Sequence, residues 1–201
     1  MIAIVDYGVG NLNSIDNGLK RLGFSSIVTE DKEEILSAKG IILPGVGAFK
    51  DAIDNLKSKG LDETIREAAE KGIPILGICL GMQLLYEKGF EDGEWDGLGL
   101  LKGDVVKFEM KDLKIPHMGW NSLKIRKNDP IVKYISEGEF VYFVHSYYAA
   151  PGDDHVVCSC EYGVDFPAIV ARGNIYGIQF HPEKSGKTGL KILKAFGEMV
   201  L

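Results

Sequence analysis

The sequence predicts an α/β protein with three layers, in which a mainly parallel central sheet carries helices on both faces and the second half adds an antiparallel, β-rich extension. Two observations lead to this prediction. In the first half of the chain, short apolar runs alternate with segments whose apolar residues recur at helical spacing, which is typical of a parallel sheet covered by helices. After about residue 98, apolar runs follow one another without helical segments between them, as in antiparallel strands.

The first half begins with the apolar run 1–5, which leads through a glycine-bearing turn into an expected helix over residues 12–22. The later elements of this half alternate along the chain, with strands expected at 26–29, 40–43 and 73–78 and helices at 48–57 and 61–71. Open parallel sheets place their chemistry at the carboxyl ends of the strands. Functional residues are therefore expected directly after these apolar runs.

The second half is expected to form strands at 104–108, 122–125, 140–145, 156–162, 168–172 and 175–180. Gly173 and Asn174 form a plausible hairpin turn between the last two. A final helix is expected from about Ser185, because apolar residues from Leu190 to Val200 recur on one face. Since no repeat and no Pro- or Ser-rich linker interrupts the chain, residues 1–201 are expected to form a single domain.

The composition excludes several functional classes. The 201 residues are 45% hydrophobic and 26% charged, which is typical of a folded globular chain. The formal net charge of −6 and the lack of a long basic run argue against nucleic acid as a partner. No apolar run approaches the roughly 18 residues of a membrane span and no basic segment precedes the first apolar run, so no membrane partner and a cytoplasmic location are expected.

The cysteines and histidines lack the spacing of a metal site. Cys79, Cys158 and Cys160 are odd in number and contain no Cys-x-x-Cys pair, so they are expected to be thiols. The run Gly8-Val9-Gly10-Asn11-Leu12-Asn13 begins like a dinucleotide fingerprint, but Asn13 takes the place of its third glycine. Neither a metal nor a nucleotide cofactor is therefore expected.

Cys79 is the candidate nucleophile. It lies between an apolar run and a helical segment in Gly77-Ile78-Cys79-Leu80-Gly81, which has the form of a nucleophile elbow. A strand that turns sharply into a helix leaves no room for side chains two positions before and after the nucleophile, which accounts for the two glycines. The helix N-terminus favours the thiolate, so an exposed and reactive thiol is expected. The alternative is a buried cysteine in a glycine-rich turn.

His181 and Glu183 are the candidate base and its orienting acid. They follow the expected strand 175–180 in Gln179-Phe180-His181-Pro182-Glu183. Pro182 disfavours a helical His181, and residues two apart in an extended segment project to the same side. Glu183 is therefore expected to contact the imidazole, as a cysteine nucleophile requires of its base. The alternative is a surface loop in which both side chains are solvated.

An oxyanion formed during acyl transfer needs N–H donors. The Leu80 N–H directly after the nucleophile is the first candidate. The elbow architecture takes a second donor from the loop after an earlier strand, here Pro44-Gly45-Val46-Gly47, so Val46 or Gly47 is the second candidate. The alternative is an ordinary tight turn.

These segments, in their order along nearly the whole chain, resemble the signature blocks of the triad glutaminases, the class I glutamine amidotransferases. Many relatives carry Pro-Gly-Gly where this chain has Pro44-Gly45-Val46-Gly47. That departure, together with Asp6-Tyr7-Gly8-Val9-Gly10-Asn11-Leu12 and Pro116-His117-Met118-Gly119-Trp120-Asn121, resembles one branch, the glutaminase subunits of imidazole glycerol phosphate synthase in histidine biosynthesis.

The resemblance implies further site residues. It implies that Gln83 holds the amino-acid end of glutamine and that Ser146 and Tyr147 border the same pocket, although Gln83 could be an ordinary surface residue and Tyr147 a core residue. It also makes Glu91 a candidate for the substrate ammonium group, with a solvated carboxylate as the favoured alternative.

The function expected from the sequence is hydrolysis of L-glutamine to L-glutamate and ammonia through a cysteinyl thioester, with the ammonia passed to a cyclase/synthase subunit as heterodimer partner. The docking face is expected around Asn11, Met118, Trp120 and Asn121, although Trp120 could be core. The alternatives are the glutaminase subunit of another amidotransferase, a cysteine peptidase or γ-glutamyl hydrolase of the same fold, a catalytically silent regulatory subunit and a nucleotide-binding module.

Overall fold

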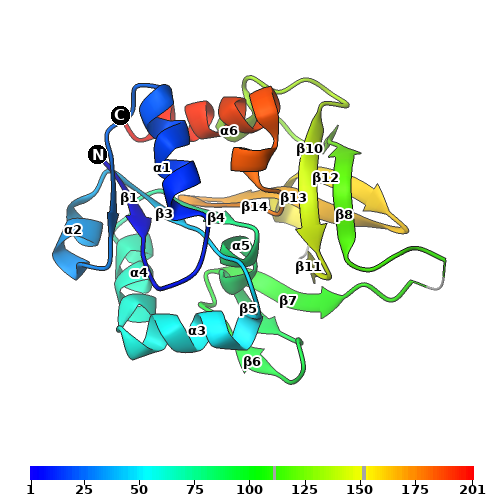
Figure 1. The fold of residues 1–201 in the computed structure, drawn as a ribbon, viewed down its shortest axis with the longest axis horizontal. Helices are drawn as coiled ribbons and strands as arrows, with labels where there is room; N and C mark the ends of the chain where they lie inside the picture. Colours follow the sequence, from blue (N-terminus) through cyan, green and yellow to red (C-terminus); the bar gives the residue numbers. More distant parts are fainter. Residues whose placement is uncertain (111, 151–152) are drawn as a thin grey trace.

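The computed structural model describes residues 1–110, 112–150 and 153–201 and confirms the three-layer α/β fold (Figure 1). Its largest sheet has eight strands in the order β2-β1-β3-β4-β14-β13-β12-β9. The strands of this sheet are β1 Ile2–Val5, β2 Ser26–Thr29, β3 Gly40–Leu43, β4 Ile75–Ile78, β9 Lys124–Ile125, β12 Val156–Tyr162, β13 Val164–Arg172 and β14 Ile175–Ile178. Neighbours from β2 to β14 are parallel and those from β14 to β9 are antiparallel.

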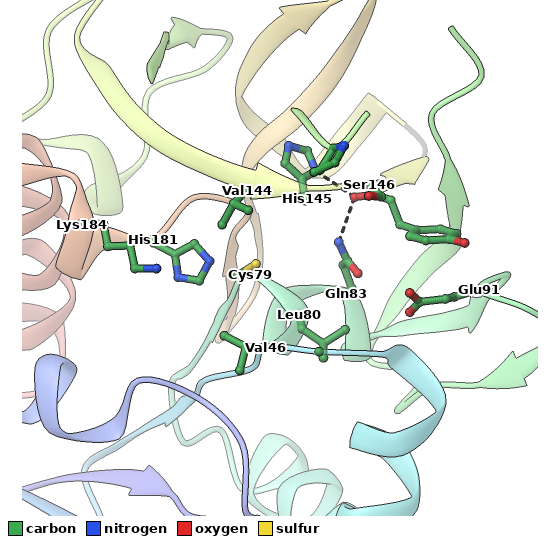
Figure 2. A pocket seen from close by; sticks show the side chains of 13 residues that line it. Val46, Cys79, Leu80, Gln83, Glu91, Val144, His145, Ser146, His181 and Lys184 are labelled. Atoms are coloured by element: carbon green, nitrogen blue, oxygen red, sulfur yellow. Dashed lines mark hydrogen bonds between the residues drawn. The ribbon is translucent and has the colours of Figure 1, made fainter. Parts of the chain in front are cut away.

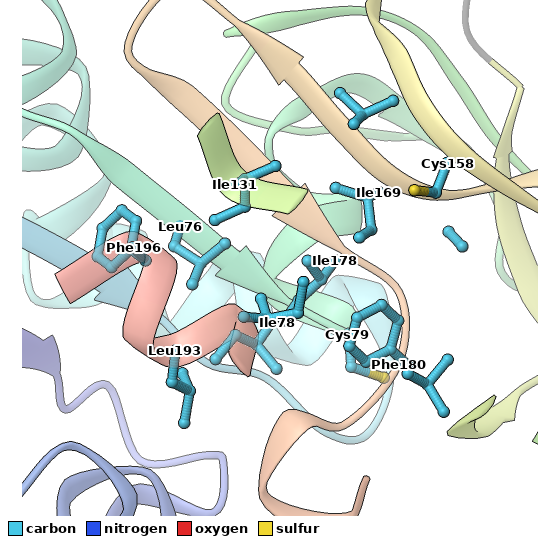
Figure 3. Close-up of a cluster of buried hydrophobic side chains, with 14 of the residues drawn as sticks. Leu76, Ile78, Cys79, Ile131, Cys158, Ile169, Ile178, Phe180, Leu193 and Phe196 are labelled. Atoms are coloured by element: carbon cyan, nitrogen blue, oxygen red, sulfur yellow. The ribbon is translucent and has the colours of Figure 1, made fainter. Parts of the chain in front are cut away.

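Helices cover both faces of the parallel part of the sheet (Figure 1). The helices are α1 Leu12–Arg21, α2 Lys32–Ser37, α3 Phe49–Ser58, α4 Leu61–Glu70, α5 Leu80–Leu84 and α6 Gly186–Met199. On one face Leu193 and Phe196 of α6 pack over Leu76 and Ile78 of β4 (Figure 3). Alternate residues of each strand point to opposite faces, and both faces are covered, so the parallel strands are apolar throughout.

Two smaller sheets contain the remaining strands. A four-stranded sheet has the order β11-β7-β5-β6, and β8 pairs with β10 as an antiparallel ribbon. Their strands are β5 Tyr86–Gly89, β6 Trp95–Asp96, β7 Leu101–Lys107, β8 His117–Ser122, β10 Phe140–His145 and β11 Tyr147–Ala150. The expected β-rich extension is therefore divided among three sheets. No helix in the described part of the chain is long and apolar enough to cross a membrane.

Most expected strands lie within two or three residues of the observed ones, but one segment differs in kind. The expected strand 122–125 is the end of β8 followed by β9, and most of β8 was not anticipated. Met118 and Trp120 of β8 are 63% and 55% exposed, so the apolar side of this strand faces outward. The apolar residues of β8 do not face the core, so the sequence lacks the pattern by which a core strand is predicted.

β14 brings a late segment of the chain into the middle of the eight-stranded sheet. It pairs with β4 in parallel and with β13 in antiparallel, through the hairpin turn expected at Gly173 and Asn174. Gly173 has φ 60°, a conformation that a glycine adopts without strain. Because β4 and β14 are in register from Ile75–Ile175 to Ile78–Ile178, the segments that follow them leave the sheet side by side.

Candidate active site

The carboxyl ends of β3, β4 and β14 meet at a cavity of about 330 Å³ (Figure 2). Its lining includes all of the expected oxyanion and substrate residues together with Cys79 and His181: Val46, Gly47, Leu80, Gln83, Glu91, Ser146 and Tyr147. The volume is within the range of pockets that hold small ligands. The sequence-predicted residues of the three signature segments are therefore brought to one place.

Cys79 occupies a sharp turn from β4 into α5. Its φ of 54° and ψ of −113° lie outside the regions that non-glycine residues ordinarily adopt, as expected of a nucleophile elbow. A Cβ on Gly77 would lie 2.7 Å from the Gly81 carbonyl oxygen, and one on Gly81 would lie 1.9 Å from that of Leu43. Both glycines are thus required by close backbone contacts.

The sequence predicted an exposed thiol at Cys79, and this prediction is wrong. Cys79 is only 6% exposed, and its sulfur is reached through the cavity. The reason is that β10, β14 and the loop after β3 enclose the turn, with Val144 and Val46 on the cavity wall. Cys158 and Cys160, in contrast, are fully buried in β12, where burial raises the pKa of each thiol to about 12. Among the cysteines, only Cys79 lines this cavity.

His181 and Glu183 form a buried pair. Their side chains are 4% and 3% exposed, and His181 Nδ1 lies 2.9 Å from Glu183 Oε1, which excludes a solvated surface loop. The expected extended geometry is wrong beyond His181, because Pro182–Lys184 is a single 3₁₀ turn. Burial alone would lower the pKa of His181, but hydrogen bonds to Cys79 and Glu183 and the negative charge of both raise it to about 9.

Asn11 has a partner that sequence reasoning did not find. Its Nδ2 donates a hydrogen bond of 2.8 Å to Glu183 Oε1, the same oxygen that faces His181. Burial raises the pKa of the Glu183 carboxyl, but the bonds from His181 and Asn11 outweigh it, so the pKa lies below its usual value. Asn11 thus helps to keep Glu183 ionised. The two residues are 172 positions apart, so local sequence holds no signal of the contact.

The loop after β3 is packed directly against the elbow. A Cβ on Gly45 would lie 2.6 Å from the Gly81 nitrogen, so the two backbones are in contact. The buried Tyr7 hydroxyl donates a 2.5 Å hydrogen bond to the Pro44 carbonyl oxygen, which fixes the start of this loop. Val46 and Gly47 follow at the cavity wall, and Gly47 has φ +95°. Sequence reasoning missed Tyr7, although it lies within a motif that it singled out.

Gln83 is not a surface residue, and the partly buried Glu91 carboxylate is bonded to the backbone. Gln83 is 5% exposed, and its Nε2 donates to the Tyr147 carbonyl oxygen at 2.9 Å and to Gln179 Oε1 at 3.0 Å, so its own oxygen is left to accept from a ligand. The Glu91 carboxylate accepts a 2.7 Å bond from the Phe49 N–H at the start of α3 and lines the cavity. It is a fixed anion at the cavity wall.

The residues expected at a docking face divide into two groups. Met118 and Trp120 are exposed on the β8–β10 ribbon, so the alternative of a core tryptophan is wrong. Asn121 donates to the Glu161 carbonyl oxygen and accepts from the Ser122 N–H, so its amide is held within the protein. Asn11 is likewise turned toward Glu183. Within the described residues, no group of three His, Cys, Asp or Glu side chains is placed to hold a metal ion.

Comparisons with known proteins agree with this geometry. The family model for glutamine amidotransferase class-I matches residues 3–199. The chain is 53% identical over 201 residues to the imidazole glycerol phosphate synthase subunit HisH of Caldanaerobacter subterraneus subsp. tengcongensis, covering 100% of this chain and 98% of that one. It is 53% identical over 200 residues to the subunit of the same name from Lactococcus lactis subsp. lactis, covering 99% and 98%.

A solved structure described as a glutamine amidotransferase superposes with a TM-score of 0.78 at 21% identity, covering 100% of this chain and 99% of that one, which supports the fold. The full-length match to the family model and the identity of more than half to whole subunits lead to one conclusion. The chain belongs to the class I glutamine amidotransferases and, within them, to the HisH subunits of imidazole glycerol phosphate synthase.

Proposed function

We propose that the chain hydrolyses the side-chain amide of L-glutamine to L-glutamate and ammonia and passes the ammonia to a cyclase subunit in L-histidine biosynthesis. The observation that carries this proposal is the meeting of Cys79 and His181 at one cavity, with the buried Glu183 against His181 Nδ1, in a chain with full-length similarity to HisH subunits. We also propose that residues 1–201 act as one domain. This is supported by the eight-stranded sheet, which takes strands from both halves of the chain.

In the first half-reaction the Cys79 sulfur attacks the amide carbon of glutamine. The pKa of about 9 supports a protonated His181 near neutral pH, and this imidazolium donates its proton to the leaving ammonia. The C–N bond breaks and a thioester remains. In the second half-reaction His181, now neutral, takes a proton from water as the water attacks the thioester, and glutamate leaves. Glu183 keeps the imidazole oriented throughout and stabilises its charge.

The cavity wall supplies the binding groups. Leu80 and either Val46 or Gly47 provide N–H donors to the oxyanion, a role supported by their position at the cavity beside Cys79. The free oxygen of Gln83 and the carboxylate of Glu91 suit the α-ammonium group of glutamine, because both accept hydrogen bonds. Ser146 and Tyr147 border the substrate.

We propose that the cyclase subunit docks on the β8–β10 ribbon. Met118, Trp120 and Phe140 are 63%, 55% and 57% exposed there, and aromatic residues and methionine are enriched in interfaces. The ribbon is joined to the active site, since the Tyr142 carbonyl oxygen accepts a 3.0 Å bond from the His181 N–H. Tyr142 also packs edge-on against Trp120. A partner that contacts Trp120 therefore acts on the strand that holds His181.

The location proposed for this reaction is the cytoplasm. The three cysteines are free thiols in the structure, which fits a reducing compartment.

The first experiment tests the nucleophile. Cys79→Ala should reduce ammonia release from glutamine to background, whereas synthesis by the complex from added ammonium salts should continue. Cys158→Ala, a buried cysteine away from the cavity, is the matched control and should retain activity. Glutaminase activity in Cys79→Ala would refute the mechanism. Turnover of peptides in preference to free glutamine would instead indicate a peptidase.

The second experiment tests the docking surface. Glutaminase rate is measured against the concentration of a cyclase subunit carrying its nucleotide ligand. We expect stimulation for the wild type, and for Trp120→Ala we expect a rise of about tenfold or more in the concentration for half-maximal stimulation, as for a buried interface tryptophan. Tyr134→Ala removes an aromatic residue that is 37% exposed away from the ribbon and serves as the control. Full activity without the partner, unchanged on its addition, would contradict the coupling.

A further inference from the structure

A chain of buried and partly buried hydrogen bonds begins at the β8–β10 ribbon. Asn121 Nδ2 lies 3.5 Å from His117 Nε2, and His117 Nδ1 lies 3.0 Å from His145 Nε2. His145 Nδ1 lies 2.8 Å from the carbonyl oxygen of Tyr147. His117 and His145 are 3% and 6% exposed. The ribbon is thus connected, bond by bond, to the cavity wall.

Which group donates in each of these hydrogen bonds follows from the Tyr147 carbonyl oxygen at one end of the chain. A carbonyl oxygen only accepts, so His145 Nδ1 carries the proton that faces Tyr147. In a neutral ring the other nitrogen then accepts, so His117 Nδ1 donates to His145 Nε2. Burial lowers the pKa of His117 to about 4 and that of His145 to about 3, which keeps both rings neutral. His117 Nε2 is left to accept from Asn121.

The chain continues through two amides to the sulfur. The Tyr147 carbonyl oxygen accepts from His145 and also from Gln83 Nε2, and Figure 2 shows these two bonds. Gln83 Nε2 has a second hydrogen, which it donates to Gln179 Oε1 at 3.0 Å. The amide group of Gln179 is thereby turned so that its Nε2 faces Cys79 Sγ, at 3.7 Å.

Gln179 is fully buried, so its amide has no water to exchange with and keeps this orientation. An N–H directed at a sulfur stabilises a thiolate more than a thiol, because a bond to a charged acceptor is the stronger one. The protonated imidazole of His181 reaches the same sulfur and carries the proton that goes to the leaving ammonia. Cys79 therefore has two donors, one that transfers a proton and one that does not.

We propose that Gln179 is a further catalytic residue, whose amide N–H stabilises the Cys79 thiolate, and that Gln83, His145 and His117 are positioning residues that aim this amide. The inference rests on the proposed function for its catalytic meaning. The inference also makes a prediction about the reactivity of the Cys79 sulfur, which can be measured without glutamine.

The test is the rate of alkylation of Cys79 by iodoacetamide in the folded chain, followed by mass spectrometry. Cys158 and Cys160 are fully buried, so Cys79 is the site that reacts. Gln179→Leu should slow alkylation at pH 7 about tenfold, as expected for loss of one hydrogen bond to a charged group. Gln179→Glu, which has nearly the same shape but places a carboxylate oxygen toward the sulfur, should slow it more. Unchanged rates in both variants would overturn the proposal.

The rate of Cys79 alkylation also tests the positioning residues. His145→Leu removes the bond to Tyr147 and should slow alkylation several-fold, with the pH at half-maximal rate moving upward, whereas His145→Asn keeps a donor near the position of Nδ1 and should restore most of the rate. His155→Asn replaces a buried histidine outside the chain and is the control. Equal rates for His145→Leu and His155→Asn would contradict the positioning role.

A measurement on the wild type avoids dependence on variants that fold poorly. The side-chain amide protons of Gln179 should shift in the NMR spectrum when Cys79 is alkylated, and an unchanged signal would overturn the contact. The two proposals fail separately. If the wild-type chain with its cyclase subunit released no ammonia from glutamine, the proposed function would fail while the alkylation results stood. If only the Gln179 variants behaved as wild type, this inference alone would fail.

Discussion

Two regions next to the same cavity, one with a single buried histidine and the other with a pair, have opposite protonation behaviour. In the first region, His181 lies between the Cys79 sulfur and the Glu183 carboxylate, and its pKa is raised to about 9. In the second region, His117 and His145 contact each other, the Tyr147 carbonyl oxygen and aromatic rings, and their pKa values are lowered to about 4 and about 3.

The difference shows that burial alone does not decide the charge of an imidazole. Removal from water disfavours the charged ring in both places, but only His181 has anionic partners that more than offset this effect. His117 stacks on Tyr162 and Phe143, at centroid distances of 4.1 and 4.8 Å, and no anionic group among the described residues raises its pKa. One histidine is therefore suited to move protons, and the pair is suited to hold groups in place.

The largest effect is expected in the proton-transfer region. His181→Asn should lower kcat for glutamine hydrolysis by about 10²–10⁴-fold, because the base and the leaving-group acid are lost together. The measurement is ammonia release in the presence of the cyclase subunit. His155→Asn is again the control, since that histidine is buried elsewhere. A rate near that of the wild type would indicate a different base.

A smaller effect is expected when the anion beside His181 is neutralised. Glu183→Gln should leave residual turnover, reduced by about 10²-fold, because the orienting acid contributes less than the base. Loss of the carboxylate should also lower the pKa of His181, so the alkaline limb of the kcat/KM profile should move to lower pH. A profile that keeps its alkaline limb while the rate falls would show that Glu183 orients the ring without affecting its charge.

Asn11 should have the next smaller effect. Asn11→Ala removes one of the two bonds to Glu183 Oε1 and should reduce kcat about tenfold, since a hydrogen bond to a charged group is lost. Asn11→Asp would face Glu183 with a second carboxylate and should be worse than Asn11→Ala. Asn13→Ala, in the same segment, is the control. If Asn11→Ala changed only the affinity for the cyclase subunit, Asn11 would act through docking alone.

A different effect, on stability and not on catalysis, is expected from pH. The folded pKa values of His117 and His145 are lowered, so their contribution to stability is complete above about pH 6.5 and is lost as the pH falls toward 4 and 3. Each contributes at most about 1.4 kcal/mol per pH unit. His181, with its raised pKa, contributes below pH 6.5 and loses this contribution as the pH rises toward 9.

Urea unfolding at a series of pH values separates the two regions. His117→Phe should flatten the acid arm of the stability curve, and His181→Asn should flatten the alkaline arm. If either variant changed both arms equally, the two groups would be coupled more tightly than their contacts indicate.

The sequence predicted the parallel strands well, because residues buried on two faces form continuous apolar runs, as at residues 40–43. It did not predict α2, β5, β6 or β11, which are short and whose partners are set by distant segments. The glycines around Cys79 marked the elbow, since the steric requirement is local. Gln179 and Asn11 carried no local sign of their contacts, because each acts on a residue about 100 or more positions away.

The position of β14 has a consequence for the growing polypeptide. A chain still attached to the ribosome that has emerged only as far as β13 contains Cys79 but lacks β14 and the segment with His181, which occupy the last part of the chain. The place beside β4 is filled only after β14 has been made, and such long-range pairing forms slowly. On the proposed mechanism, a chain that ends before β14 lacks the base that Cys79 needs and should not hydrolyse glutamine.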